Sequence, residues 1–329
     1  MTSLLNQDQP LDELIVVDND PTSHGVSQRL AGIDDTRLRI LPEPRLGASH
    51  ARNTGLANVR TPLVAFVDDD AVPDLDWARR ITEVFDCDER IQCVTGLVVP
   101  LSLETVEQVW FEEFNGFEKG YRLAVWSPDR LDVALQDRLS TLAHEAGSPS
   151  PAVTGRRGVA FPYTAAEFGS GNSMAFRTSA LRAIGGFDPA LGPGTSTCAG
   201  EDLDVFRAIY LSGGTMVYQP GAVVRHHHRR DYGHLRQQVY AYGTGLTAHM
   251  TKLVVTRPAR LPHLLTRAPA SIRVLLSPRS EKNAGKSPFF PADLTRTELR
   301  GIIRGPWAYL RSRRAIRRAE RSATHTDPS

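Results

Sequence analysis

The chain has 329 residues, 41% of them hydrophobic and 23% charged, which is the composition of an ordinary globular protein with a sizeable core. Its 39 Lys and Arg nearly balance 37 Asp and Glu, so the net charge of +2 gives no general reason to expect a nucleic-acid partner. Three cysteines without C-x-x-C spacing argue against a disulfide framework or a zinc knuckle and favour a reducing, cytoplasmic compartment.

The first third of the chain alternates short apolar strands with helices. Its start has no basic patch followed by an apolar run, so no signal peptide is predicted. Residues 14–17 and 63–67 are apolar and rich in β-branched side chains, which predicts strands buried on both faces. Other predicted elements are helices over 47–58, 75–85 and 105–117 and a strand over 91–99. The alternation predicts an α/β fold with a mainly parallel sheet flanked by helices.

The pattern weakens between Tyr121 and Pro162, where we expect a long loop near a site. Order returns with the segment 169–176. The later predicted elements are helices over 178–184, from Glu201 onward and over 235–250, and one or two strands over 215–225 around Pro220. Composition shifts to Arg and Pro beyond Lys252, which predicts a first domain over 1–252 and a basic, partly helical extension with a polar tail over 253–329.

Three consecutive carboxylates, Asp68, Asp69 and Asp70, follow the strand at 63–67. Their mutual repulsion in an apolar setting costs several kcal/mol unless a cation lies among them, and oxygen ligands select Mg²⁺ or Mn²⁺. Strand alternation would place Asp70, with or without Asp68, on the metal and turn Asp69 to another contact. Asp18 ends the strand at 14–17 in the same way, and ligands bind at such strand ends. The alternative is that these aspartates make turns and helix caps.

Two further groups could join the same chemistry. Glu201 and Asp202 open a helix, where an ionised carboxylate can accept a proton from a hydroxyl nucleophile or can merely stabilise the helix start. His226 and His228, at a strand end, can point to the same side and complete a divalent metal site. Flanking arginines make a solvated basic stretch an equal alternative for the histidines.

The motifs of the chain, taken together and in order, resemble family 2 glycosyltransferases with a GT-A fold, particularly actinobacterial members. The resemblance covers roughly Leu14 to Met250. It rests on VVDN at 16–19, GASHARNTG at 47–55, AFVDDD at 65–70, GGFD at 185–188, GED at 200–202 and the segment at His226.

The resemblance implies a role for each matching residue. Asp18 contacts the nucleotide base, Asp70 binds a metal on the donor diphosphate, and Asp68 and Asp69 reach the ribose or metal-bound water. Asp202, beside Glu201, is the catalytic base. The remaining implied contacts are His226 with the metal, with His228 as a rival, and Arg52, Asn53 and Asn172 with the nucleotide sugar.

The implied reaction is an inverting, Mn²⁺- or Mg²⁺-dependent transfer from a nucleotide-diphosphate sugar to a hydroxyl acceptor. The acceptor expected is a glycan or a lipid-linked molecule of envelope polysaccharide or glycolipid synthesis. A sugar-nucleotide pyrophosphorylase is a weaker alternative, because no Gly-rich phosphate loop follows the first strand.

One departure from the family pattern concerns the N-terminus. Family members begin with a strand and helix that precede the Val-Val-Asp strand, and the 13 residues before Leu14 are too few for that unit. Residues 1–10 are expected to match only the end of the helix. The expectation is either a start codon assigned too late or a degenerate copy that serves as a sugar-nucleotide or protein-binding module.

Residues 296–321 hold nine arginines against Glu298 and Glu320, a net charge of +7. Apolar side chains are interleaved, and a helix broken near Gly305 and Pro306 could lie on the anionic inner face of a membrane. A solvated tail or a helix packed on the first domain is the alternative. No run reaches the ~18 apolar residues of a membrane span, so an integral membrane protein is not expected.

Overall fold

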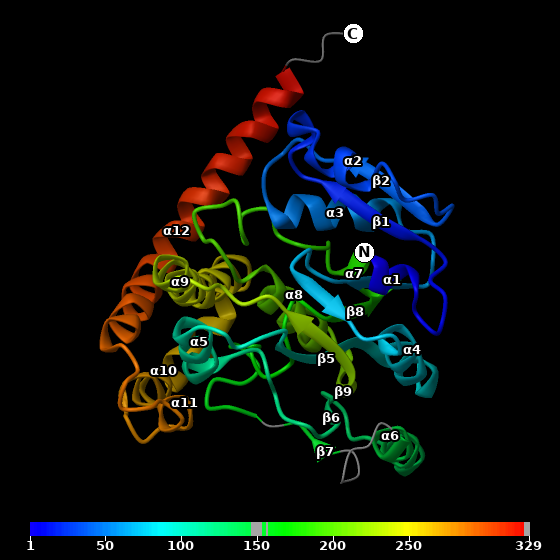
Figure 1. Cartoon of the computed structure of the whole chain (residues 1–329). Helices are drawn as coiled ribbons and strands as arrows, with labels where there is room; N and C mark the ends of the chain where they lie inside the picture. Colours follow the sequence, from blue (N-terminus) through cyan, green and yellow to red (C-terminus); the bar gives the residue numbers. More distant parts are fainter. Residues whose placement is uncertain (146–152, 156, 326–329) are drawn as a thin grey trace.

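A computed structural model describes residues 1–145, 153–155 and 157–325 (Figure 1). A seven-stranded sheet forms its centre, and a separate two-stranded sheet lies beside it. The strands of the large sheet, in spatial order, are β3 (Leu63–Phe66), β8 (Met174–Arg177), β5 (Ile91–Pro100), β9 (Thr215–His226), β6 (Ala124–Trp126) and β7 (Val153–Thr154), with β4 (Ala71–Pro73) paired to β9. The small sheet contains β1 (Leu14–Asp18) and β2 (Leu38–Pro42).

Helices cover both faces of the large sheet. Strand β5 is the clearest example, because Val94 and Val98 face one apolar cluster while Cys93 and Leu97 face another. The α-helices are α1 (Thr2–Leu5), α2 (Gly25–Leu30), α3 (Ala48–Asn58), α4 (Trp77–Cys87), α5 (Val106–Asn115), α6 (Val133–Glu145), α7 (Thr178–Ala183), α8 (Glu201–Leu211), α9 (Tyr232–Thr256), α10 (Leu261–Leu276), α11 (Glu281–Ala284) and α12 (Ala292–His325).

The α/β class is confirmed, but the expected mainly parallel pairing is wrong, because four of the six described strand pairs of the large sheet are antiparallel. Strands β5 and β9 are parallel, but β8 runs antiparallel to both β3 and β5. Residues 14–17 form β1 as predicted, but their expected burial on both faces is wrong, because each of them is only half-buried. The same expectation is wrong for residues 63–67, of which only Val64 is buried. Within the described residues, β1 is hydrogen-bonded to β2 alone.

The long loop expected between Tyr121 and Pro162 is wrong over much of its length. Helix α6 lies there, and its Leu135, Leu139 and Ala143 recur at the spacing of one helical face and pack in the core. Strands β6 and β7 precede and follow α6 in the sequence, and they extend the sheet because β6 pairs with β9 and β7 pairs with β6. Residues 146–152 and 156 lie outside the described part of the chain.

Residues 215–226 form one strand. Opposite β5, the pairing jumps from Gln219 to Val223, so Pro220 sits in a bulge where it needs to donate no ladder hydrogen bond.

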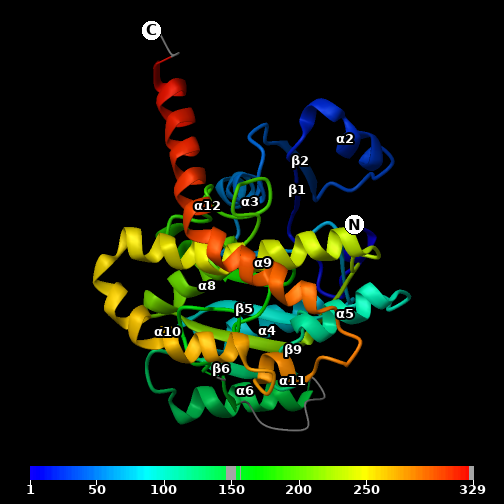
Figure 2. The same cartoon turned by 90° about the vertical axis from the view of Figure 1, so that its left-hand side faces the viewer.

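The C-terminal helices pack on the first predicted domain, residues 1–252. Helix α9 runs through Lys252, the residue at the predicted domain boundary, and α12 lies along it (Figure 2). The expected break of α12 near Pro306 is wrong. Gly305 explains why, since a Cβ there would lie 2.4 Å from the carbonyl oxygen of Thr244. The glycine permits close contact with α9, and this packing offsets the helix-breaking cost of proline, about 3 kcal/mol.

Candidate active site

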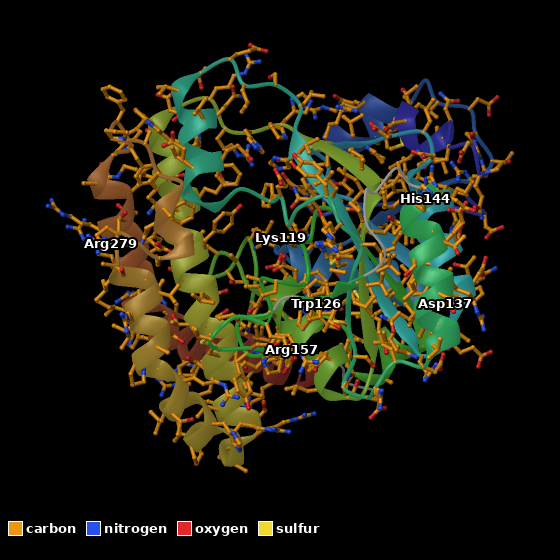
Figure 3. The ribbon with its side chains drawn as sticks, turned by 90° about the horizontal axis from the view of Figure 1, so that it is seen from below. Lys119, Trp126, Asp137, His144, Arg157 and Arg279 are labelled. Carbon is orange, nitrogen blue, oxygen red and sulfur yellow. The ribbon has the colours of Figure 1, made fainter. Side chains whose placement is uncertain are left out.

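A cavity of about 3070 Å³ opens between the large sheet and the C-terminal helices. In Figure 3, Lys119, Trp126 and Arg157 lie around this hollow, while Asp137 and His144 lie on α6, away from it. Predicted site residues that line the cavity are Arg52, Asp68, Asp70, Asn172, Glu201, Asp202 and His226. The tertiary structure therefore gathers side chains that are more than 170 residues apart in the sequence.

Arg52 connects two of the predicted carboxylates. From α3, its Nη1 donates to Glu201 Oε1 at 2.7 Å, and its Nη2 donates to Asp68 Oδ1 at 2.8 Å. Burial raises the pKa of Glu201, although Arg52 opposes that shift. Glu201 Oε2 is buried without a hydrogen-bond partner among the described residues. Arg52 thus holds α8 and the end of β3 together, and its guanidinium is already engaged by protein carboxylates.

Replacing Arg52 by Met should lower the free energy of unfolding by about 3 kcal/mol, because it leaves the buried Glu201 carboxylate without its cation. Chemical denaturation measures the change. The matched control is Arg230→Met, since Arg230 forms an ion pair with Glu104 in which both side chains are exposed. We expect that control to change stability by about 0.5 kcal/mol or less. Equal losses in the two variants would contradict a structural role for Arg52.

Asp202 is fixed at the first turn of α8. The backbone N–H of Gly171 donates to its Oδ2 at 3.0 Å, and the N–H of Leu203 donates to its Oδ1 at 2.8 Å. Gly171 approaches so closely that a Cβ there would lie 3.1 Å from Oδ2. Burial raises the pKa of Asp202 above its ordinary value, although Arg52 opposes the shift. A carboxylate held in this way can accept a proton from a hydroxyl in the cavity.

Asp70 and the histidine segment form a second group on the cavity wall. His226 Nε2 lies 3.3 Å from Asp70 Oδ1 because β4 and β9 pair with Ala71 opposite His226. His226 Nδ1 lies 2.9 Å from His228 Nδ1, and His228 Nε2 lies 2.6 Å from Glu112 Oε1. Burial opposes ionisation of Asp70, but His226 and Arg229 outweigh it and lower the pKa of that carboxyl.

This chain of contacts distinguishes the two candidate histidines. If His228 donates through Nε2 to Glu112, its Nδ1 accepts from His226, which leaves a lone pair on His226 Nε2. Two acceptor atoms 3.3 Å apart, His226 Nε2 and Asp70 Oδ1, then require a proton or a metal ion between them. His228 contacts Glu112 and does not line the cavity. It therefore orients His226, as outer-shell groups orient metal-binding histidines.

The donor set fits a divalent ion only in part. Asp70 and His226 offer one oxygen and one nitrogen, while Asp68 is occupied by Arg52. Among the described residues, no three His, Cys, Asp or Glu side chains cluster closely enough to hold a metal. An ion at this place would need further ligands from outside the protein, such as diphosphate oxygens.

Three predicted residues do not line the cavity. Asp18 Oδ1 accepts from the backbone N–H of Asp20, as in an Asx turn. Asn53 makes two hydrogen bonds with the backbone of Phe187, which ties α3 to the turn after α7. Asp69 is exposed. Asn172, by contrast, is buried and lines the cavity, where its Oδ1 accepts from Ser170.

Sequence reasoning missed Glu112, Lys119 and Arg229. Lys119 lines the cavity, and burial lowers its pKa. Arg229 reaches Asp70 at 3.5 Å. Only Arg229 carried a usable signal, since it belongs to the basic segment after His226. Glu112 lies in a helix whose sequence does not distinguish it from other surface glutamates.

A mixed central sheet flanked by helices on both faces is the arrangement of the GT-A fold of glycosyltransferases. The family profile described as "Glycosyltransferase like family 2" matches residues 1–242, and the chain belongs to that family. The fold is also that of the mannosyltransferase PcManGT from Pyrobaculum calidifontis, solved with GDP-Man and Mn²⁺. That structure has a TM-score of 0.53 and 18% identity, with coverage of 93% of this chain and 81% of the other.

Two curated relatives match shorter segments. The pre-mycofactocin glycosyltransferase of Mycobacterium tuberculosis is 25% identical over 193 residues, which are 58% of this chain and 33% of the relative. The glucosyl-dolichyl phosphate glucuronosyltransferase of Haloferax volcanii is 32% identical over 107 residues, which are 32% of this chain and 34% of the relative. The chain thus spans about a third of the length of these relatives.

Proposed function

We propose that the chain transfers a sugar from a nucleotide-diphosphate sugar to a hydroxyl acceptor with inversion at the anomeric carbon. The observation that carries this proposal is that the half-buried Asp202 carboxylate and the Asp70–His226 pair lie on the walls of one cavity. Asp202 is suited to remove a proton from the acceptor. The Asp70–His226 pair is suited to bind a metal ion, which in turn would bind the diphosphate of the donor. The family membership supports the same reaction class.

The roles follow from what each side chain can do. Asp202, held by the N–H groups of Gly171 and Leu203, would take the acceptor proton at a carboxylate oxygen. Asp70 and His226 would hold Mn²⁺ or Mg²⁺, which when bound neutralises the departing diphosphate. Asn172 offers an amide to the donor from the cavity wall. Arg52 would hold the Glu201 and Asp68 side chains in place around them through one hydrogen bond to each.

The acceptor and the cellular place belong to the same proposal. The name of the Haloferax volcanii relative includes glucosyl-dolichyl phosphate, which supports a lipid-linked or glycan hydroxyl as the acceptor of this chain. We place the reaction in envelope polysaccharide or glycolipid synthesis in the cytoplasm, at the inner face of the membrane. No described helix is long and apolar enough to cross a bilayer.

The direct test is hydrolysis of nucleotide-diphosphate sugars, followed by release of the nucleoside diphosphate. We expect slow release from one donor of a panel covering UDP-, GDP- and dTDP-sugars, dependent on Mn²⁺ or Mg²⁺ and abolished by EDTA. Calorimetry with the free nucleoside diphosphates accompanies it. Metal-dependent binding without hydrolysis or transfer would favour the degenerate binding module, and absence of both would contradict the proposal.

A further inference from the structure

The outer side of α12 is an apolar ridge among arginines. The inner side packs on α9 through small buried residues such as Gly301, Gly305 and Ala308. The outer side carries Ile303, Trp307 and Leu310, whose residues are 80%, 49% and 37% exposed. Their spacing of three and four residues places them on one helix face. Exposing such apolar side chains to water is unfavourable, so the ridge indicates a surface that contacts another apolar surface.

Trp307 shows the mixed character of this ridge. The guanidinium of Arg304 lies 3.9 Å from the centre of its ring, and that of Arg311 lies 5.6 Å from it. Exposed arginines also follow along the same helix, at Arg314 and Arg318. Among the described residues none of these four arginines forms an ion pair with a carboxylate. The ridge therefore presents an amphipathic aromatic ring inside an uncompensated positive field.

Helix α10 repeats the pattern. It has no buried residue, and its Leu261 and Leu276 are 41% and 57% exposed and do not line the cavity, whereas Leu265 and Ile272 do. The segment 257–279 contains five arginines and no Asp or Glu, and two of these arginines, Arg257 and Arg260, do not line the cavity. In Figure 2, α10 and α12 both lie on the face turned to the viewer. We name this face, made by α10 and the outer side of α12, the basic apolar face.

We infer that the basic apolar face binds the surface of an anionic lipid bilayer. The α12 ridge and the Leu261 and Leu276 side chains of α10 would enter the boundary between headgroups and acyl chains, and the arginines beside them would contact lipid phosphates. Charge selects this occupant, because a second copy of the same positive face would be repelled. A nucleic acid would satisfy the arginines but leave exposed isoleucine and leucine side chains without an apolar partner. The inference rests on this surface and not on the proposed reaction.

Only some of the apolar side chains in residues 296–321 are available to contact lipid. Tyr309 is buried against α9, and Ile302 and Ile316 are half-buried, so these residues face the protein. The irregular apolar pattern of residues 296–321 is in fact two faces of one continuous helix. One face binds α9, and the other remains for the membrane.

The experiment is co-sedimentation of the full chain with vesicles of phosphatidylcholine containing phosphatidylglycerol, compared with pure phosphatidylcholine. We expect binding to the anionic vesicles only, and strong weakening as salt rises. Replacing Arg304, Arg311 and Arg314 together by Gln should weaken binding about a hundredfold, since each arginine near an anionic surface contributes about fivefold. The matched control changes Arg29, Arg60 and Arg130, exposed arginines elsewhere, to Gln and should bind within about threefold of wild type.

Apolar contact is tested separately. Ile303→Ser with Trp307→Ser, and Leu261→Ser with Leu276→Ser, should each weaken binding at high salt, whereas Val133→Ser on α6, 73% exposed, should not. Brominated lipids should quench the fluorescence of the wild type, and Trp307→Phe should remove that quenching. Nucleoside diphosphate affinity should stay unchanged in all these variants, which separates this inference from the proposed reaction.

Several results would overturn the inference. Equal binding by the arginine variant and its control would show that another surface meets the membrane. A dimer in light scattering that the Ile303 and Trp307 changes dissociate would assign the ridge to a second copy. Tighter binding to a DNA duplex than to vesicles, unaffected by the Trp307 change, would assign the arginines to nucleic acid.

Discussion

Replacing Asp202 by Asn should lower the turnover of sugar transfer by about a hundredfold or more, while donor binding stays nearly intact. That loss is the usual scale for a positioned general base, and the amide keeps the volume of the carboxylate but cannot take the acceptor proton. The hydrogen bonds from Gly171 and Leu203 hold the side chain in place in the wild type. Steady-state kinetics and calorimetry of the nucleoside diphosphate measure the two effects.

The pH profile gives an independent signature of Asp202. Because burial raises its pKa, the carboxylate becomes protonated at a higher pH than an exposed aspartate, near 3.9, would. Wild-type activity should therefore fall as pH drops through that raised pKa, and the Asn variant should lose this limb. The matched control is Asp137→Asn on α6, which lies away from the cavity (Figure 3). Weaker donor binding with turnover preserved would instead place Asp202 in the donor pocket.

Replacing Asp70 by Ala should abolish the metal dependence of donor binding. The change removes the oxygen that faces His226 Nε2 at 3.3 Å and leaves one protein ligand at the proposed metal position. Calorimetry of the nucleoside diphosphate with and without Mn²⁺ should show the same affinity in both conditions for the variant. Wild-type affinity should fall sharply when the metal is withdrawn.

The neighbouring Asp69→Ala variant is the matched control for Asp70. Asp69 is exposed and does not line the cavity, so its loss should leave metal-dependent binding within about twofold of wild type. The pair separates a direct ligand from the general negative charge of the aspartate triplet. Unchanged metal dependence in the Asp70 variant, or equal effects of the two changes, would contradict the assignment to Asp70.

Local signals predicted most of the framework around the site. The apolar runs at 14–17, 63–67 and 91–99 became strands, and the helices at 47–58 and 75–85 formed close to their predicted bounds. Such elements follow from periodicity and turn residues, which act over a few residues. Helix α6 was missed although Leu135, Leu139 and Ala143 have helical spacing, because flanking Ser, Pro and Gly outweighed a weak pattern.

The residues of the site were also predictable only in part. The types of its residues were recognisable, since carboxylate triplets, an acidic helix start and a histidine segment are local motifs. Their partners were not: Arg52 lies 149 residues from Glu201, and Glu112 lies 116 residues from His228. Asn53 and Asp18 fit the motif in sequence, yet the structure directs their side chains to backbone groups outside the cavity.

The sequence by itself determined the α/β class, the family and the chemical identity of the candidate groups, because these depend on composition, order and short-range spacing. Only the tertiary structure decided that His226 rather than His228 faces Asp70, that Arg52 is held between two carboxylates, and that Pro306 lies inside a continuous helix. Each of these depends on which distant surfaces pack together. Packing brings residues that are distant in the sequence within a few ångströms of each other, and a pattern of neighbouring residues does not predict such contacts.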